Sequence, residues 1–225
     1  MTKNAIILCS GGIDSVTTAY LAKKKGGYDN MIILFFNYRQ KSLAAERRCS
    51  KITAKKLGAE FVEVKLDWLS KISGSLINKK GRIKKLRRKD LRDTKRESEK
   101  YYVPCRNTLF LVYALALAES LYIKEKKAYN VFVGFKNEGK ESYPDTTEDF
   151  VKEMNHLIKI STNFKGKIVA PLIKKDKEDI ILLGKQLGVD FRNTHSCYVS
   201  NKHCGRCLAC MLRKEGFYWA GISPC

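Results

Sequence analysis

The sequence predicts an α/β fold in which helices alternate with the strands of a doubly wound, mostly parallel five-stranded sheet, followed by a small cysteine-rich module. Short apolar runs alternate with helical patterns, a glycine turn directly follows the first run, and four cysteines crowd into residues 197–210. We therefore divide the chain into a main domain over residues 1–190, with a basic flexible insert at about 70–100, and a C-terminal module over residues 191–225.

Each expected strand is a short apolar run, and each expected helix has apolar residues at helical spacing. Strands are expected at residues 5–9, 31–36, 61–64, 130–134 and 168–170. Helices are expected from about Ile13, over Leu43–Leu57, over Thr108–Ile123, from Asp145 to about Ile160, and from Asp176 to Leu187. Gly58 and Gly188 stand where two of these helices would end. Parallel crossovers are right-handed, so helices should cover both faces, with ligands at the carboxyl ends of the strands.

Two of the expected helices carry more detailed predictions. Residues Thr108–Ile123 are rich in leucine, alanine and aromatic residues on nearly all sides, so we expect this helix to be buried. Asp145 can cap the following helix, and Glu148, three residues later, can complete a capping box.

The charge of the chain favours anionic partners. The formal net charge of +21 suits nucleotides, RNA or DNA without choosing among them. Residues 71–100 hold 13 basic and four acidic residues with little apolar content, which predicts a mobile surface loop, either a solvated linker or a lid over an anion. No apolar stretch reaches the ~18 residues that span a bilayer, and the N-terminus lacks a secretion-signal pattern, so we expect a cytoplasmic protein without membrane contact.

The glycine turn lies between a strand that ends at Cys9 and a helix that begins near Ile13. The first N–H groups of that helix have no partner within it and carry the positive end of the helix dipole, so they form a site for an anion. Ser10 and Ser15 can add hydroxyl donors, and Asp14 can hold a magnesium ion that bridges phosphates. We interpret the turn as a phosphate-binding loop that is not a Walker A motif; the alternative is a corner whose glycines serve geometry alone.

The four clustered cysteines predict a metal site. Cys197, Cys204, Cys207 and Cys210 have the spacing C-x6-C-x2-C-x2-C. Four thiolates suit tetrahedral zinc, at ~2.3 Å per Zn–S bond, and such a closed site is structural. We therefore expect a zinc-binding module, with iron–sulfur ligation as the alternative. Metal ligation is favoured over disulfides because no secretion-signal pattern precedes the domain.

Further segments, taken together with the loop and the cysteines, point to a known family. These segments are Ser10–Ser15, Phe36–Gln40, Val103–Asn107, Ser142–Asp145, Ala170–Leu172, Ser196–Tyr198 and Cys204–Arg213. In this order they resemble the 7-cyano-7-deazaguanine synthases of queuosine and archaeosine biosynthesis, which belong to the PP-loop ATP pyrophosphatases. The resemblance covers nearly the whole chain except the basic insert, and it implies a Rossmann-like sheet of the adenine nucleotide alpha hydrolase type.

The resemblance implies an ATP-dependent carbon–nitrogen ligase that is commonly a homodimer. Such enzymes convert 7-carboxy-7-deazaguanine and ammonia to the nitrile through an adenylated carboxylate and an amide, with ATP, Mg²⁺ and Zn²⁺ as cofactors. Carried over to this sequence, the nucleotide is held by Cys9, Ser10, Gly11, Gly12, Ile13, Asp14, Ser15, Val16 and Thr17. The catalytic residues are Asp14, Ser15 and Arg106, and the substrate residues are Tyr38, Gln40, Arg106, Asn107, Tyr143 and Asp145.

The sequence departs from the family pattern mainly on the substrate side. Ser42 stands where the family usually has histidine, and Thr146–Thr147 replace the Cys-Arg that usually follows Tyr-Pro-Asp. Three alternatives therefore stay open. A homologue can couple the activated acid to a protein or nucleic-acid amine, a PP-loop enzyme can modify tRNA, and a non-catalytic zinc-bearing module can bind RNA.

Overall fold

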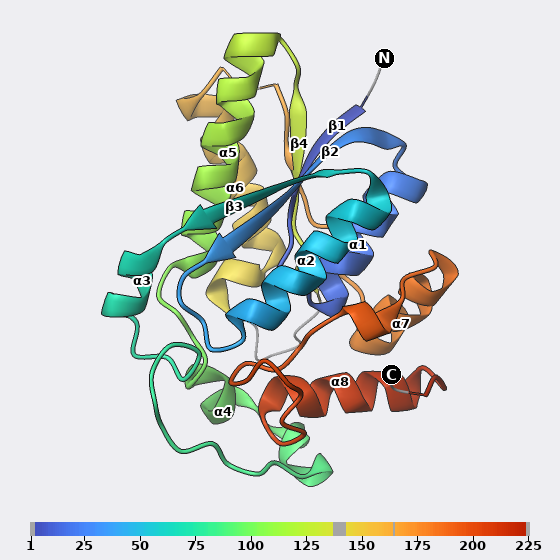
Figure 1. Ribbon diagram of the computed structural model, residues 1–225. Coiled ribbons are helices and arrows are strands. Elements are labelled where there is room, and N and C mark those ends of the chain that lie inside the picture. The colour runs from blue at the N-terminus through green and yellow to red at the C-terminus, as the bar shows by residue number, and fades with distance from the viewer. Residues whose placement is uncertain (1–2, 137–142, 164, 224–225) are drawn as a thin grey trace.

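The strands form one five-stranded sheet in which every neighbouring pair is parallel. The computed structural model describes residues 3–136, 143–163 and 165–223. The strands are β1 (Lys3–Leu8), β2 (Tyr28–Asn37), β3 (Glu60–Lys65), β4 (Tyr129–Phe132) and β5 (Ile168–Val169), in the spatial order β3-β2-β1-β4-β5 (Figure 1). The predicted α/β fold with a five-stranded parallel sheet is confirmed. The strand order reverses between β1 and β4, and sheets of this type bind ligands at such a switch point.

Helices cover both faces of the sheet (Figure 1). On one face lie α1 (Ile13–Lys24) and α2 (Leu43–Leu57), with α7 (Lys177–Gln186) packed on α1; on the other lie α5 (Arg106–Glu125) and α6 (Glu148–Ser161). Each face of the sheet has its own hydrophobic core. Ala5 and Ile7 of β1 pack in the core under α1 and α7, and Ile6 packs in the core under α5 and α6. Both sides of this strand are therefore buried, which explains its unbroken apolar run. No helix among the described residues combines the length and the apolar composition that a bilayer crossing requires.

Short elements complete the fold. They are α3 (Asp67–Ile72), η1 (Arg88–Arg92), α4 (Lys95–Glu99), η3 (Pro144–Thr146), η4 (Phe191–Asn193) and α8 (Leu208–Trp219). The basic insert passes through η1 and α4 below the carboxyl ends of the strands, next to α8 (Figure 1). Its side chains Ile77 and Leu86 are buried, and the Leu86 N–H donates to the Arg206 carbonyl over 3.2 Å. The insert is therefore joined to the C-terminal module by packing and by the main chain.

The predicted bounds of α2 are confirmed at both ends. Gly58 follows its last residue with a φ of +62°, the left-handed conformation that ends many helices. The burial predicted for α5 is wrong on one side. Leu111, Ala114 and Ala118 are buried against the sheet, whereas Val112 is 50% exposed. Only the inner face of this helix packs against the sheet, and no described element covers its outer face.

The capping box predicted at Asp145 is also wrong. Helix α6 begins at Glu148, and the Thr147 hydroxyl accepts from the Phe150 N–H over 3.1 Å as its N-cap. Asp145 lies one turn earlier, in the short helix η3 that Pro144 begins. Thr147 and not Asp145 caps α6, because the turn that begins at Pro144 separates Asp145 from the start of this helix.

Candidate active site and metal centre

A cavity of about 540 Å³ opens at the carboxyl ends of β1, β2 and β4, at the switch point of the sheet. Its walls include the glycine loop after β1, the segments after β2 and β4, the helix η3, the starts of α5 and α7, and the C-terminal module with α8. The basic insert adds Leu91, Thr94 and Ser98 to the lining. Segments far apart in sequence thus enclose one space large enough for a small molecule.

The glycine loop brings the main chain close to helix α2. Gly11 has a φ of +75°, and a Cβ atom at this position would lie 2.6 Å from the Cys49 Cβ and 2.7 Å from the Glu46 carbonyl oxygen. Gly12 is the N-cap residue of α1. Only glycine fits at Gly11, so the loop is held tightly and presents the first N–H groups of α1 toward the cavity.

Hydroxyl and charged groups surround these N–H groups. The Ser10 and Ser15 hydroxyls lie 3.4 Å apart, and the Ser15 hydroxyl donates to the Gly12 carbonyl over 3.1 Å. Both carboxylate oxygens of Asp14 accept from the Lys177 ammonium at 2.7 Å. This ion pair is mostly buried, with the two side chains 19% and 25% exposed. Sequence reasoning missed Lys177, which lies 163 positions from Asp14 and carries no local signal of the contact.

The structure divides the predicted nucleotide segment in two. Cys9, Ser10, Gly12, Ile13, Asp14 and Ser15 line the cavity. Gly11 shapes the loop from behind, while Val16 and Thr17 are buried within α1 and are not among the lining residues. Thr17 instead faces α7, where its hydroxyl would lie 2.9 Å from a Cβ placed on Gly184. Direct contact with a nucleotide is thus available to the first group only.

Most predicted substrate residues also reach this cavity, namely Tyr38, Gln40, Arg106, Asn107 and Tyr143. Arg106 Nη1 donates to the Tyr38 hydroxyl over 3.5 Å. Burial lowers the pKa of the Arg106 guanidinium. Electrostatic attraction to the oxygens of Tyr38, Tyr198 and Asp145 raises it by more, so the net shift is upward. Burial raises the pKa of the Tyr38 phenol. The site therefore keeps a positive charge beside a neutral hydroxyl.

Asp145 lies outside the main cavity, in a small neighbouring pocket that it shares with Arg106 and Tyr143. Its carboxylate accepts from the Asn107 N–H over 3.3 Å, and the Asn107 amide donates back to the Asp145 carbonyl over 3.3 Å. Asp145 thus caps the N-terminus of α5, the helix that carries Arg106.

Glu46 is a cavity carboxylate that sequence reasoning missed. It accepts from the Ser42 hydroxyl over 2.6 Å and from the Gln40 amide over 2.8 Å. Burial raises the pKa of Glu46, and the hydrogen bonds from Ser42 and Gln40 oppose that rise. The four-residue spacing of Ser42 and Glu46 along α2 could have indicated this contact.

The C-terminal module touches the glycine loop directly. The His195 N–H donates to the Gly11 carbonyl over 2.8 Å. Arg213, 5% exposed, donates to the Thr194 hydroxyl over 2.8 Å and to the Phe191 carbonyl over 2.9 Å. Arg213 therefore fixes the segment that leads to His195, and His195 in turn supports the loop.

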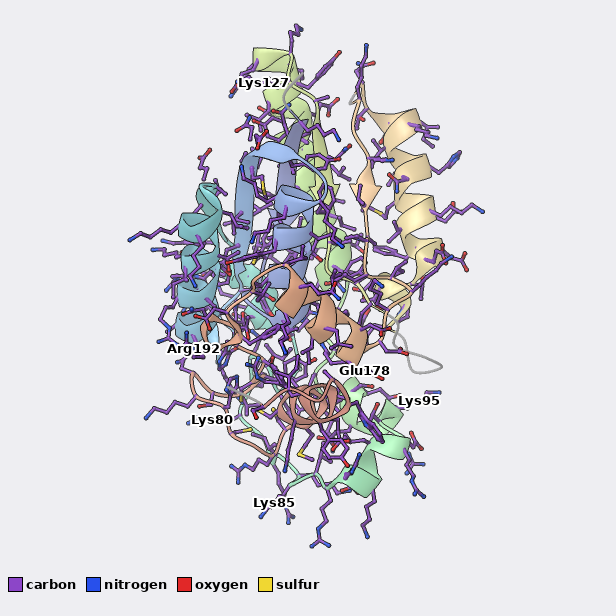
Figure 2. All side chains as sticks on the ribbon, turned by 90° about the vertical axis from the view of Figure 1, so that its right-hand side faces the viewer. Lys80, Lys85, Lys95, Lys127, Glu178 and Arg192 are labelled. Atoms are coloured by element: carbon purple, nitrogen blue, oxygen red, sulfur yellow. The ribbon has the colours of Figure 1, made fainter. Side chains whose placement is uncertain are left out.

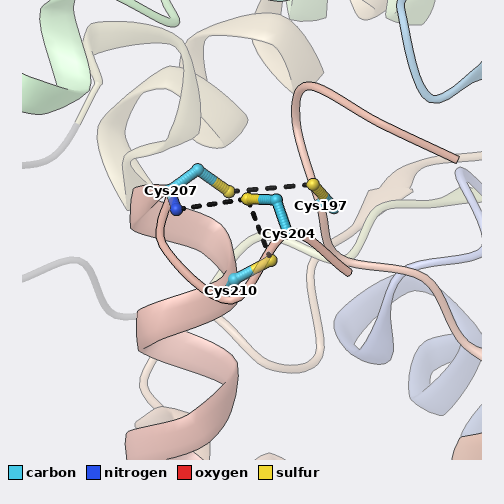
Figure 3. A group of neighbouring side chains, drawn as sticks. All are labelled: Cys197, Cys204, Cys207 and Cys210. Atoms are coloured by element: carbon cyan, nitrogen blue, oxygen red, sulfur yellow. Dashed lines mark hydrogen bonds between the residues drawn. The ribbon is translucent and has the colours of Figure 1, made fainter. Parts of the chain in front are cut away.

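The four predicted metal ligands come together within this module (Figure 3). Their sulfur atoms all lie within 4.8 Å of one another, and the pairs Cys197–Cys207 and Cys204–Cys210 are 3.9 Å apart. Tetrahedral zinc with ~2.3 Å bonds requires sulfur atoms about 3.8 Å apart, so the group fits such an ion. Hydrogen bonds from Cys207 and Cys210 lower the pKa of Cys197, while the interaction with Cys197 raises that of Cys207 to about 12. The four thiols can hold a metal ion, whose charge would offset the repulsion between thiolates.

The fold and the site define a doubly wound α/β protein with a glycine loop at its switch point and a four-cysteine module beside it. The family model described as "Queuosine biosynthesis protein QueC" matches residues 4–221. The chain belongs to this family.

Curated relatives agree over almost the whole length. A 7-cyano-7-deazaguanine synthase from Methanoculleus marisnigri is 35% identical, over 98% of this chain and 96% of the relative. One from Nitratiruptor sp. is 38% identical, over 96% and 94%. Among solved structures, NMN synthetase from Francisella tularensis aligns with a TM-score of 0.49 at 14% identity, over 99% of this chain and 79% of that one. This last similarity is too distant to carry a functional argument.

Proposed function

We propose that the chain is an ATP-dependent ligase that converts 7-carboxy-7-deazaguanine and ammonia to 7-cyano-7-deazaguanine. The observation that carries the proposal is an intact glycine loop, opening into a cavity, in a chain that matches named synthases over nearly its full length. The relatives' names favour this activity over tRNA modification, over an RNA-binding module and over another amine acceptor. The proposal also includes a homodimer in the cytoplasm, where ATP is abundant.

The first step requires activation, because a carboxylate is a poor electrophile. A substrate carboxylate oxygen attacks the α-phosphorus of ATP, an acyl-adenylate forms and pyrophosphate leaves. The N–H groups at the start of α1, with Ser10, Ser15 and Lys177 beside them, are placed to stabilise the negative charge on the departing pyrophosphate. Much of the rate enhancement would come from holding the two reactants in one cavity.

Ammonia then attacks the acyl carbon, AMP leaves and the amide forms with loss of a proton. The amide oxygen then attacks the α-phosphorus of a second ATP and pyrophosphate leaves; loss of AMP and of both amide protons gives the nitrile. Both activation steps use the same loop. Arg106, with the Tyr38 hydroxyl 3.5 Å away, is placed to pair with the substrate carboxylate and later with the amide oxygen.

Each metal would have a separate task. The Asp14 carboxylate supplies oxygen ligands of the kind Mg²⁺ prefers, and Mg²⁺ would neutralise phosphate charge. Lys177 balances Asp14 in the absence of nucleotide. Zinc held by Cys197, Cys204, Cys207 and Cys210 would have no open position and would serve the structure of the module.

The test is an incubation of the protein with ATP, Mg²⁺, ammonia and 7-carboxy-7-deazaguanine, followed by mass detection of the nitrile and of AMP. We expect both products, and neither when the acid is left out. Omitting ammonia should limit pyrophosphate release to about one per active site, with AMP held in the acyl-adenylate and no nitrile formed. AMP and pyrophosphate without nitrile at saturating ammonia would contradict the proposed amine and favour another acceptor.

A further inference from the structure

We propose that the basic insert, residues 71–100, and helix α8 together form a binding surface for single-stranded nucleic acid. The inference rests on the arrangement of this surface and does not depend on the proposed reaction. All 13 lysines and arginines of the insert are exposed, whereas of its four acidic residues Glu97 is buried and Asp90 is half-buried. The insert thus presents a dense positive field to solvent.

The packing of the insert holds these charges in place. Leu86 is 5% exposed in the core shared with the C-terminal module, and Arg88 Nε lies 2.9 Å from Glu215 of α8. Lys80 and Lys85 project from this end of the molecule, while Lys127 lies at the opposite end (Figure 2). Cations on an anchored segment lose less conformational freedom on binding than cations on a free linker.

Two aromatic rings lie beside one of the insert's cations, Arg88. Tyr218 and Trp219, at the end of α8, are 61% and 64% exposed, and their rings meet edge to face at 5.2 Å. The Arg88 guanidinium lies 4.4 Å from the Tyr218 ring centroid and 5.1 Å from that of Trp219. Exposed rings next to cations form a stacking platform for nucleobases along a phosphate backbone. An acidic protein or a lipid surface would use the charge but would have no base to place on the rings.

The rings also favour single strands over duplexes. The faces of bases are hidden within a duplex and become available only where the strand is unpaired. The positive surface reads phosphates, which RNA and DNA share, so the common ligand is an unpaired oligonucleotide. The experiment therefore includes both kinds of strand.

The test measures fluorescence anisotropy of labelled RNA and DNA strands of about 16 nucleotides, the upper end of single-domain site sizes, over a series of salt concentrations. The charge variant is Lys80→Gln with Lys85→Gln and Lys89→Gln. Its matched control, Lys124→Gln with Lys126→Gln and Lys127→Gln, removes the same charge from the opposite end. The stacking variant is Tyr218→Ala with Trp219→Ala. Bound metal and the thermal midpoint verify that each variant is folded.

We expect the charge variant to weaken binding and to reduce the salt slope by about 2, the value for three lost phosphate contacts on a single strand. The stacking variant should weaken binding about 5- to 100-fold with an unchanged salt slope. The control should bind like the unaltered protein. The proposal fails if the control weakens binding as much as the charge variant, if the stacking variant binds normally, or if a duplex or polyglutamate competes as well as the unlabelled strand. A preference between RNA and DNA would identify the natural strand.

Discussion

The glycine loop and the cysteine module meet at one corner of the molecule but are built from different groups. The loop acts through its main chain: glycines allow the turn, and the N–H groups of α1 face the cavity. The module acts through side chains, with four thiols within 4.8 Å and the buried Arg213 holding the segment before them. Among the described residues, the main-chain hydrogen bond from His195 to Gly11 links the two directly.

Because of this difference, we expect substitutions in the loop to affect catalysis and substitutions in the cysteine module to affect stability. Side chains at the loop, such as Asp14, can be replaced without removing packed apolar contacts. The ligands of the module are enclosed by the core, so their loss should reach the loop through His195. Substitutions in the two regions should therefore have different effects, and the following experiments test that difference.

The largest effect is expected from Cys207→Ser. The thiol is fully buried, and its loss removes one of four ligands from a site whose occupancy is coupled to folding. We expect metal loss, measured by elemental analysis, and a loss of several kcal/mol in the free energy of unfolding. Cys105→Ser, an exposed cysteine outside the cluster, should keep both. A folded, metal-free Cys207→Ser protein with full activity would show that the module does not support the loop.

Asp14→Ala should act on chemistry instead. We expect a loss of about 10²–10³ in turnover, the usual cost of removing one group that stabilises transition-state charge, with metal content unchanged. The matched control is Asp29→Ala, which breaks a surface pair with Lys23 at 3.1 Å and should leave turnover intact. Full activity in Asp14→Ala, measured as AMP release, would remove this residue from the proposed mechanism.

Gly11→Ala tests the close approach of the loop to α2. Both Gly11 and Gly27 have a positive φ, but a Cβ on Gly27 meets no atom within 4 Å, whereas one on Gly11 meets Cys49 at 2.6 Å. Gly27→Ala should cost about 1–2 kcal/mol from backbone strain alone. Gly11→Ala should cost about 1–3 kcal/mol more, because the packing around Cys49 must shift, and it should abolish turnover. Equal unfolding midpoints in denaturant for the two variants would contradict the tight loop.

The sequence predicted the parts of the site that rest on local pattern. An apolar run followed by two glycines and a helical pattern predicted the strand–turn–helix of the glycine loop, and the cysteine spacing predicted the cluster of four thiols that the structure brings together. The parallel sheet with helices on both faces followed from the alternation of strands and helices and from right-handed crossovers, whereas the order of the strands was not predicted.

The sequence could not predict contacts between distant segments. Lys177 meets Asp14 across 163 positions, and His195 reaches Gly11 only through the path of the C-terminal module. Asp145 has suitable chemistry for capping either of two helices, and only the turn begun by Pro144 decides that it caps α5. The exposed side of α5 was missed because its apolar residues outnumber those that the sheet can cover.

The smallest effect concerns Glu46, whose pKa is raised by burial in the cavity wall. A raised pKa means that the folded protein favours the protonated carboxyl. The contribution of Glu46 to the free energy of unfolding is therefore present at low pH and is lost as the pH rises through the raised pKa. Glu46→Gln resembles the protonated form, since its amide still accepts from one neighbour while the Ser42 hydroxyl turns to accept. At neutral pH it should raise the thermal midpoint by about 2–4 °C, the shift that about 1 kcal/mol produces at this size, and the gain should vanish near pH 4.

Glu63→Gln, on strand β3, should change the thermal midpoint in the opposite direction. Arg47 donates to Glu63 at 2.6 and 2.8 Å, and this hydrogen bonding lowers the pKa of the carboxyl. Its stabilising contribution is present at neutral pH and is lost as the pH falls through the lowered value, so Glu63→Gln should lower the midpoint at neutral pH and have no effect in acid. Midpoints measured between acid and neutral pH therefore separate a carboxylate whose charge is disfavoured by burial from one whose charge is stabilised by an arginine. If both variants lower the midpoint at neutral pH, Glu46 belongs with Glu63, and the cavity wall is as much a part of the stabilising framework as the cysteine module.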